Sequence, residues 1–209
     1  MSAKIELTTE QAIMEAAEEL FLENGYARTT TTAIARKAGC NQALVHYYYR
    51  SKENLFGLVF RKKISVFLSF FLQTTQEELP FEEKLSKRVA AHFELIRAND
   101  RIPVMLFNEV ATNRELAQKV LENFSDLPLP VLQQLQAELD VEFKAGRICK
   151  TLSTDLVFNI FSMNMMAFLT KPLVQMFITA SDEEMERQLE IRKAANIRTL
   201  LQSLKPNTL

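Results

Sequence analysis

Apolar residues recur along this chain at intervals of three and four positions, which is the spacing of one face of an α-helix. In residues 9–24 such a stripe alternates with glutamates that would face water. The stripe consists of Ile13, Ala16, Ala17, Leu20 and Phe21, and the glutamates are Glu15, Glu18, Glu19 and Glu23. Strand-like alternation is lacking, and the four glycines and six prolines stand mainly between helical segments. The pattern therefore predicts an all-α fold.

Capping residues and glycines predict where the first helices begin and end. Gly25 ends the first helix, the second runs from Thr31 or Thr32 to Gly39, and Asn41 caps a third. Ser51 caps a long fourth helix, which continues to about residue 76. At 1.5 Å per residue it would be on the order of 38 Å long, enough to join two sub-domains. Further helices are predicted at 82–98, 103–111, 114–124, 130–145, 154–170 and 182–204, the last with Ser181 and Glu184 as a capping box.

The segment 154–170 differs from the others because it is apolar on nearly every face. Such a helix is buried on two sides. One alternative is a deep core within a single chain. We favour the other, in which one side packs within the chain and the other meets a second copy, because few helices are fully enclosed in a domain of this size.

Three residues stand at the spacing of a helix-turn-helix unit. Ala35 allows two helix axes to approach closely, Gly39 supplies a positive φ at the turn, and Val45 anchors the second helix against the first. Such a unit serves mainly to place its second helix in the major groove of DNA.

Basic residues are concentrated around this unit. Residues 26–63 contain eight basic residues and the single acid Glu53, a net charge of +7, whereas the rest of the chain carries 17 basic and 25 acidic residues, a net charge of −8. A solvated charge run is the alternative. Coincidence with the helix-turn-helix pattern favours phosphate binding instead.

Composition argues against several other classes of protein. The first residues do not resemble a secretory signal, and no stretch reaches the roughly 18 apolar residues of a membrane span, so we expect a soluble cytoplasmic protein. Cys40, Cys149, His46 and His92 are too far apart in sequence for a local zinc motif. The sequence contains no Gly-rich phosphate loop, no nucleophile elbow and no acid/base pair at a spacing typical of catalytic residues. It therefore predicts neither an enzyme nor a cofactor.

The N-terminal region, with Gly39, the segment Asn-Gln-Ala-Leu-Val-His-Tyr-Tyr-Tyr and then Ser-Lys-Glu at 51–53, resembles the tetracycline-repressor (TetR) family of bacterial regulators. The resemblance covers about residues 9–60. It implies a DNA-binding domain at 1–52, joined by the long helix to a larger helical ligand-binding and dimerisation domain at 53–209. It also implies a homodimer through helices 154–170 and 182–204, with an inducer pocket among the middle helices. In 182–204, Met185, Leu189, Leu200, Leu201 and Leu204 offer an apolar surface for that dimer.

On the third helix, Val45 and Tyr49 are expected to point inward and the other residues outward. Gln42 can form two hydrogen bonds with adenine, and Ala43 or Leu44 can touch a thymine methyl group. By the resemblance, His46, Tyr48 and Lys52 are placed for phosphates, and packing is the alternative for Tyr47 and Tyr48. Thr30 and Thr31, with nearby backbone N–H groups, also suit phosphate oxygens. The predicted DNA contacts are Thr30, Thr31, Gln42, Ala43, Leu44, His46, Tyr47, Tyr48 and Lys52.

Of the 15 phenylalanines, 14 lie after residue 55 and are accompanied by several methionines. These residues can line an adaptable cavity for a lipophilic ligand, or they can simply form the core. His92 lies on an apolar stripe, where it is either a hydrogen-bonded core residue or a ligand contact. The candidate ligand contacts are Phe67, Phe71, His92, Met105, Asn108, Asn159 and Met163.

The sequence thus predicts a homodimeric transcriptional regulator, most simply a repressor, that leaves a palindromic double-stranded DNA operator when a small apolar effector binds. One rival is a DNA-binding protein without an inducer that acts through a protein partner. The other is an enzyme that carries a helix-turn-helix, against which the missing catalytic residues count.

Overall fold

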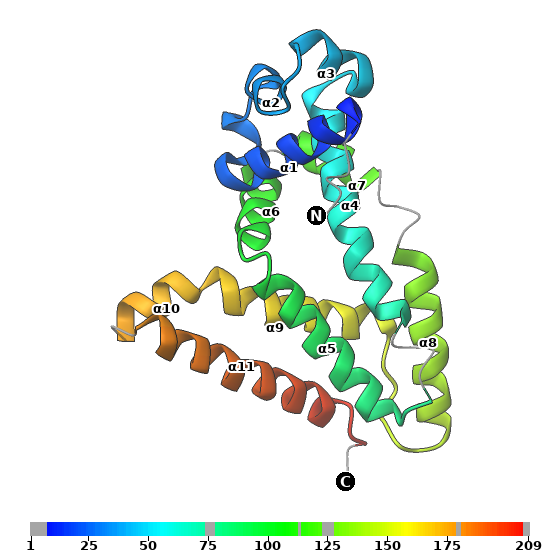
Figure 1. Ribbon diagram of the computed structural model, residues 1–209. Helices are drawn as coiled ribbons and strands as arrows, with labels where there is room; N and C mark the ends of the chain where they lie inside the picture. Colours follow the sequence, from blue (N-terminus) through cyan, green and yellow to red (C-terminus); the bar gives the residue numbers. More distant parts are fainter. Residues whose placement is uncertain (1–7, 74–77, 113, 123–127, 179–180, 207–209) are drawn as a thin grey trace, which may run out of the picture. The chain divides into compact units, whose positions relative to one another are not determined.

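The computed structural model describes residues 8–73, 78–112, 114–122, 128–178 and 181–206, with some side chains in α4, α6, α7 and α8 left out (Figure 1). Over these residues every regular element is a helix, which confirms the all-α prediction. The helices are α1 (Thr9–Arg28), α2 (Thr31–Lys37), α3 (Gln42–Tyr49), α4 (Lys52–Gln73), α5 (Phe81–Arg97), α6 (Arg101–Thr112), α7 (Arg114–Glu122), α8 (Pro128–Lys144), α9 (Ser153–Leu169), α10 (Lys171–Ile178) and α11 (Asp182–Ser203).

The chain divides into two compact units. The first comprises residues 1–64 and 104–125, and the second comprises 65–103 and 126–209. The division at residue 52 that the sequence suggested stays a prediction.

In the first unit, α1 to α3 and the start of α4 share an apolar core. The stripe of α1 is buried at Ile13, Ala16, Ala17 and Phe21 and half-buried at Leu20. An aromatic cluster joins the end of α1 to α4. Phe56 of α4 lies 5.0 Å from the ring of Phe21 and 5.2 Å from that of Tyr26, in edge-to-face geometries that aromatic rings favour. The buried apolar residues of residues 8–63 are Ile13, Ala16, Ala17, Phe21, Tyr26, Ile34, Ala35, Val45, Tyr49, Leu55, Phe56, Val59 and Phe60.

In the second unit, α5 packs against both α9 and α11, and α8 packs against α9. The core cluster is formed by Leu85, Val89, Val131, Leu135, Leu139, Ile148, Leu156, Ile160, Leu200 and Leu204. Arg88 on α5 is buried beside this cluster and makes a bidentate ion pair with Glu138 on α8, at 2.7 and 2.8 Å. Because a buried guanidinium without its carboxylate would be costly, this pair ties α5 to α8.

The predicted caps are present in the structure. The side chain of Asn41 accepts from Leu44 N at the start of α3, and Ser51 Oγ accepts from Asn54 N at the start of α4. Ser181 and Glu184 form the capping box of α11.

The end of α1 differs from the prediction. Gly25, at φ 75° and ψ 170°, interrupts the helix, but the chain then makes a further helical turn to Arg28. The Thr29 hydroxyl lies 2.8 Å from Gly25 O and 3.0 Å from Leu20 O and shares its single hydrogen between these carbonyls, so it ties the last turn to the helix before the interruption.

Helix α10 was not predicted. The predicted helices leave residues 171–181 without an element, and this stretch contains Pro172. Proline is compatible with the first turn of a helix, where its missing N–H would have no intrahelical partner, so a new helix begins there.

The prediction that five apolar residues of α11 form a surface for a second copy is wrong for most of them. Met185, Leu189, Leu200 and Leu204 are buried within the chain, and Leu201 packs partly against the same core. The apolar stripe of α11 is therefore used inside the second unit.

Among the described residues, no single helix is long and apolar enough to cross a bilayer. The pair α9 and α10, bent by 49°, meets that length and composition only when the two are taken together.

A candidate DNA-binding interface

The turn between α2 and α3 is built as the sequence predicted. Ala35 is 3% exposed and Val45 is 2% exposed, so the two residues expected at the helix crossing are both in the core. Gly39 has a φ of 70°, and Cys40 N donates to Ala35 O at 3.0 Å to close the turn. Thr30 caps α2 by accepting from Ala33 N at 3.1 Å, which leaves its hydroxyl hydrogen available as a donor.

Helix α3 presents most of its predicted DNA contacts to solvent. Gln42, Ala43, His46 and Tyr47 are exposed, Leu44 is half-buried, and Tyr48 is near the boundary of exposure. Tyr47 is 71% exposed, so its ring does not pack in the core of this chain; it contacts Tyr48 edge to face, with the ring centroids 5.1 Å apart.

Tyr49 is buried as predicted. Its hydroxyl donates to Glu10 O at 2.9 Å, which attaches the end of α3 to the start of α1. Burial raises the pKa of Tyr49 to about 12, so it stays a neutral donor at ordinary pH.

The amide of Gln42 is already engaged. Its Nε2 donates to Thr31 Oγ1 at 2.9 Å, and its Oε1 accepts from Thr32 Oγ1 at 3.1 Å. Thr32 was not among the residues that the sequence singled out, because a hydrogen bond between positions ten residues apart has no local signature.

His46 interacts with the end of its own helix. Its Nδ1 lies 3.2 Å from Arg50 O, and since a carbonyl can only accept, Nδ1 carries the proton. Arg50 adopts a φ of 66°, the conformation that ends α3. The other ring nitrogen of His46 is left for an outside partner.

Lys52, a predicted phosphate contact, also makes several contacts within the chain. Its Nζ donates to Tyr26 O and to Thr29 O, each at 3.0 Å, and lies 4.0 Å from the centre of the Tyr26 ring. The Tyr26 hydroxyl donates to Glu53 at 2.6 Å, and this hydrogen bond lowers the pKa of the Glu53 carboxyl. Lys52 therefore joins the end of α1 to the start of α4, and one of its three N–H donors remains for a phosphate.

Acids of α1 neutralise part of the basic segment. Lys37 pairs with Glu19, and both Lys62 and Lys63 pair with Glu18. Burial acts to raise the pKa of Glu18, but the two lysines outweigh it and the pKa is lowered. The exposed arginines Arg28, Arg36 and Arg50 are left on the surface of this unit.

Residues 13–59 match the model of the family described as bacterial regulatory proteins, tetR family. Residues 13–59 therefore form a domain of the tetR family of bacterial regulatory proteins. The match covers the helix-turn-helix and the first turns of α4. The second unit lies outside the matched residues.

Two curated relatives illustrate how far the similarity extends. The chain is 29% identical over 111 residues to the fatty acid metabolism regulator protein of Bacillus subtilis (strain 168), a match that covers 53% of this chain and 57% of the relative. It thus spans little more than half of that relative's length. It is 41% identical to the HTH-type transcriptional regulator QacR of Staphylococcus aureus over 44 residues, which are 21% of this chain and 23% of QacR.

Solved structures show the same fold over nearly the whole chain. The fatty acid degradation regulator FadR of Bacillus halodurans has a TM-score of 0.71 at 21% identity, covering 95% of this chain and 97% of FadR. FadR of Bacillus subtilis in complex with stearoyl-CoA has a TM-score of 0.70 at 23% identity, covering 92% and 98%. At these identities the similarity shows a shared fold, and it covers both units.

His92, a candidate ligand contact, is buried in a polar network of the second unit. Asn164 Nδ2 donates to Val89 O at 3.0 Å and to His92 Nδ1 at 3.1 Å, while Asn196 Nδ2 donates to Asn164 Oδ1 at 2.9 Å. The ring of His92 also stacks on Phe161 at 5.6 Å. Burial lowers the pKa of His92 to about 3. This is the alternative of a hydrogen-bonded core histidine, and its bonds join α5, α9 and α11.

The other candidate ligand contacts are not gathered at one described site. Asn159 on α9 is exposed, and Met163 packs partly against the core of the second unit. Asn108 is exposed and belongs to the first unit. The side chains of Phe67, Phe71 and Met105 lie outside the described part of the structure. The ligand contacts therefore stay predictions.

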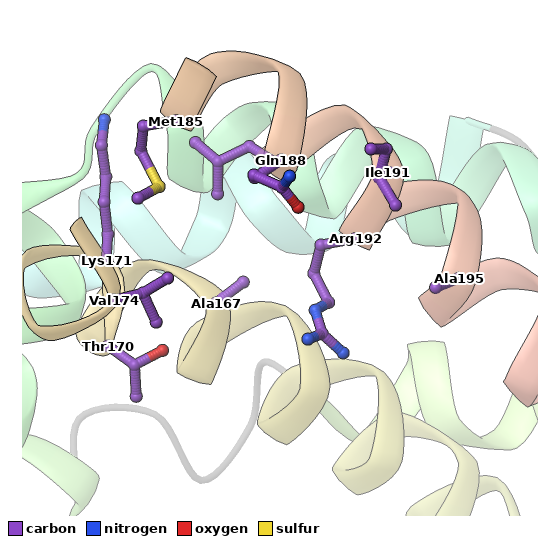
Figure 2. A pocket seen from close by; sticks show the side chains of 10 residues that line it. Ala167, Thr170, Lys171, Val174, Met185, Gln188, Ile191, Arg192 and Ala195 are labelled. Carbon is purple, nitrogen blue, oxygen red and sulfur yellow. The ribbon is translucent and has the colours of Figure 1, made fainter. Parts of the chain in front are cut away.

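A surface groove of about 250 Å³ lies between α11 and the junction of α9 with α10 (Figure 2). It combines small and apolar residues with the basic side chains of Lys171 and Arg192. Its lining is Ala167, Thr170, Lys171, Val174, Met185, Gln188, Leu189, Ile191, Arg192 and Ala195. The sequence could not indicate it, because α10 forms one of its walls. Within the described residues, no group of three or more His, Cys, Asp or Glu side chains could hold a metal ion.

Proposed function

We propose that the protein is a homodimeric transcriptional repressor that binds a palindromic operator and leaves it when a small apolar effector binds. The observation that carries the proposal is the outward face of α3, where Gln42, Ala43, His46 and Tyr47 are exposed on a turn set by Gly39. The tetR-family domain at residues 13–59 supports this use of the helix.

A second copy of the chain is proposed from the unpartnered face of α9. Ile160, Met165 and Phe168 are buried in the core, while Phe158 and Met166, on the other side, are 71% and 51% exposed. Ile191 of α11 is 61% exposed as well. Because a helix that is apolar all round needs cover on two sides, a symmetric partner is the occupant that accounts for these residues.

The effector is proposed to carry a long acyl chain. The support is similarity to a fatty acid metabolism regulator and to a FadR structure that holds stearoyl-CoA. The phenylalanine and methionine content after residue 55 agrees with such an apolar ligand. The continuous helix α4 runs from the first unit into the second, so we propose that it transmits the effector's influence to α3.

DNA binding is tested by selection of duplexes from a random-sequence pool with the full-length protein, followed by footprinting. We expect a two-fold symmetric site whose half-sites are roughly 34–36 Å apart, with affinity that falls steeply as salt increases. A pool without a consensus, or a site without symmetry, would contradict the proposal.

The effector is tested by adding stearoyl-CoA, free stearate or coenzyme A to the complex with the selected duplex. We expect the acyl compounds to release the DNA and to raise the melting temperature of the free protein, because a ligand shifts an equilibrium only if it prefers one state. Coenzyme A alone controls for the head group. If no acyl compound releases DNA, the proposal of an acyl effector is wrong. That result would favour the alternative of a DNA-binding protein that acts through a protein partner.

A further inference from the structure

Two threonines at the start of α2 hold the first side chain of α3. The Gln42 amide donates to Thr31 Oγ1 at 2.9 Å and accepts from Thr32 Oγ1 at 3.1 Å, so it bridges two neighbouring hydroxyls across the helix-turn-helix. Gln42 and Thr32 are exposed and Thr31 is half-buried. This threonine clamp therefore lies on the surface that α2 and α3 offer to solvent.

The hydrogen bonds of the clamp use only half of the amide's capacity. A glutamine amide has two N–H donors and two lone pairs on its oxygen. Thr31 takes one donor and Thr32 takes one lone pair, which leaves one of each. One donor and one acceptor are what adenine requires in the major groove, where N7 accepts and the N6 amino group donates.

We propose that Thr31 and Thr32 are positioning residues for base recognition. They hold the Gln42 amide so that its remaining donor and acceptor face an adenine, and Thr32 thereby sets specificity without touching the base. The inference rests on the proposed function, since it requires that α3 enter a major groove.

The physical advantage is preorganisation. A free glutamine side chain loses rotational entropy when a base immobilises it. In the clamp this loss is incurred when the protein folds, so a larger part of the base contact appears as binding free energy. A mismatched base gains nothing from the arrangement, because the fixed donor and acceptor then meet the wrong groups.

The variant that isolates the effect is Thr32→Val, which keeps the branched shape and removes the hydroxyl. Thr32→Ser is its matched control, because it retains the hydroxyl. Thr31→Val removes the other bond. Thr31 is also a predicted phosphate contact, so this variant is expected to weaken binding to every duplex in addition to its effect on specificity.

The experiment measures the affinity of the full-length protein for its best selected duplex and for each single-base-pair substitution of that duplex. Gln42→Ala should abolish discrimination at one A·T pair in each half-site. Thr32→Val should lower discrimination at that same pair about three- to tenfold, as expected for the loss of one hydrogen bond, and leave the other pairs unchanged. Thr32→Ser should behave as wild type, and Thr32→Val should have no further effect on discrimination in a Gln42→Ala background.

The outcomes separate this inference from the function on which it rests. If selection yields no consensus sequence, both the proposed function and the role of the threonine clamp are contradicted. If Gln42→Ala loses discrimination but Thr32→Val and Thr31→Val keep it, the clamp does not position the amide while the regulator function stands. If Thr32→Val weakens all duplexes equally, Thr32 has a general structural role and the inference is overturned.

Discussion

Tyr26 shows how one residue can join several elements. Its backbone carbonyl accepts from Lys52, its ring lies under the same ammonium group, and its hydroxyl donates to Glu53. The ring also packs against Phe21 and Phe56. Lys52 therefore contributes to the stability of the first unit, whatever contact it also makes with DNA.

Replacing Lys52 by methionine should lower the free energy of unfolding by about 1–2 kcal/mol, because two carbonyls that accept from an ammonium group lose their donor. Urea denaturation measures the change. Lys37→Met is the matched control, since its ion pair with Glu19 lies on the surface and should matter little. Equal stability of the two variants would show that the Lys52 bonds are not stabilising.

His92 makes the stability of the second unit depend on pH. Burial lowers its pKa to about 3 from 6.5, so below pH 6.5 the unfolded chain takes up a proton that the folded chain does not. The contribution of neutral His92 is thus complete above pH 6.5 and is lost as pH falls toward 3, with a slope of at most about 1.4 kcal/mol per pH unit. Urea denaturation between pH 6.5 and 4 should show a smaller slope for His92→Gln than for wild type. Identical slopes would mean that His92 is not the group responsible.

At the scale of elements, the turn before α3 depends on a backbone conformation. Gly39 has a φ of 70° and an added Cβ would meet nothing within 4 Å, so the conformation alone requires glycine. Gly146, after α8 in the second unit, has a φ of 71° and the same open surroundings.

Gly39→Ala and Gly146→Ala should each cost roughly 1–2 kcal/mol of stability, the cost of the left-handed region for a residue with a Cβ. Only Gly39→Ala should also weaken DNA binding, because only that turn orients α3. Thermal melting and a binding titration measure the two effects. Equal loss of DNA binding in the two variants would contradict a specific role for the Gly39 turn.

Helix α9 illustrates why a pattern predicts an element more reliably than its partners. Its all-round apolar composition correctly indicated two apolar faces. Which face the chain covers is decided by α5 and α11, which pack on the side of Ile160 and Phe168. The face that carries Phe158 stays exposed in the single chain, where a second copy is proposed to cover it.

At the scale of the whole molecule, the proposed dimer gives Phe158→Glu and Leu200→Glu opposite expectations. Phe158 is 71% exposed, so its variant should remain folded but sediment as a monomer with greatly reduced operator affinity. Leu200 is 2% exposed within its own core, so its variant should unfold. Analytical ultracentrifugation with circular dichroism distinguishes the two. A Phe158→Glu variant that stays dimeric would place the interface elsewhere.

Ion pairs reduce the positive charge that the DNA-binding surface of the molecule offers to phosphates. The segment 26–63 has a net charge of +7, but Glu18 and Glu19 of α1 pair with three of its lysines. Phosphate attraction therefore rests more on Arg28, Arg36 and Arg50 than a count along the sequence suggests.

The sequence by itself determined the helical fold, the positions of most helices and the helix-turn-helix. Apolar periodicity, the caps at Asn41 and Ser51 and the positive φ of Gly39 all depend on neighbours within a few residues, so they can be inferred locally. Only the tertiary structure decided which face of α11 is buried, that His92 bonds Asn164, that Lys52 caps the end of α1, and that Gln42 is held by Thr31 and Thr32. These contacts join residues from 10 to 72 positions apart, and which of many compatible side chains meet is decided by the packing of whole helices.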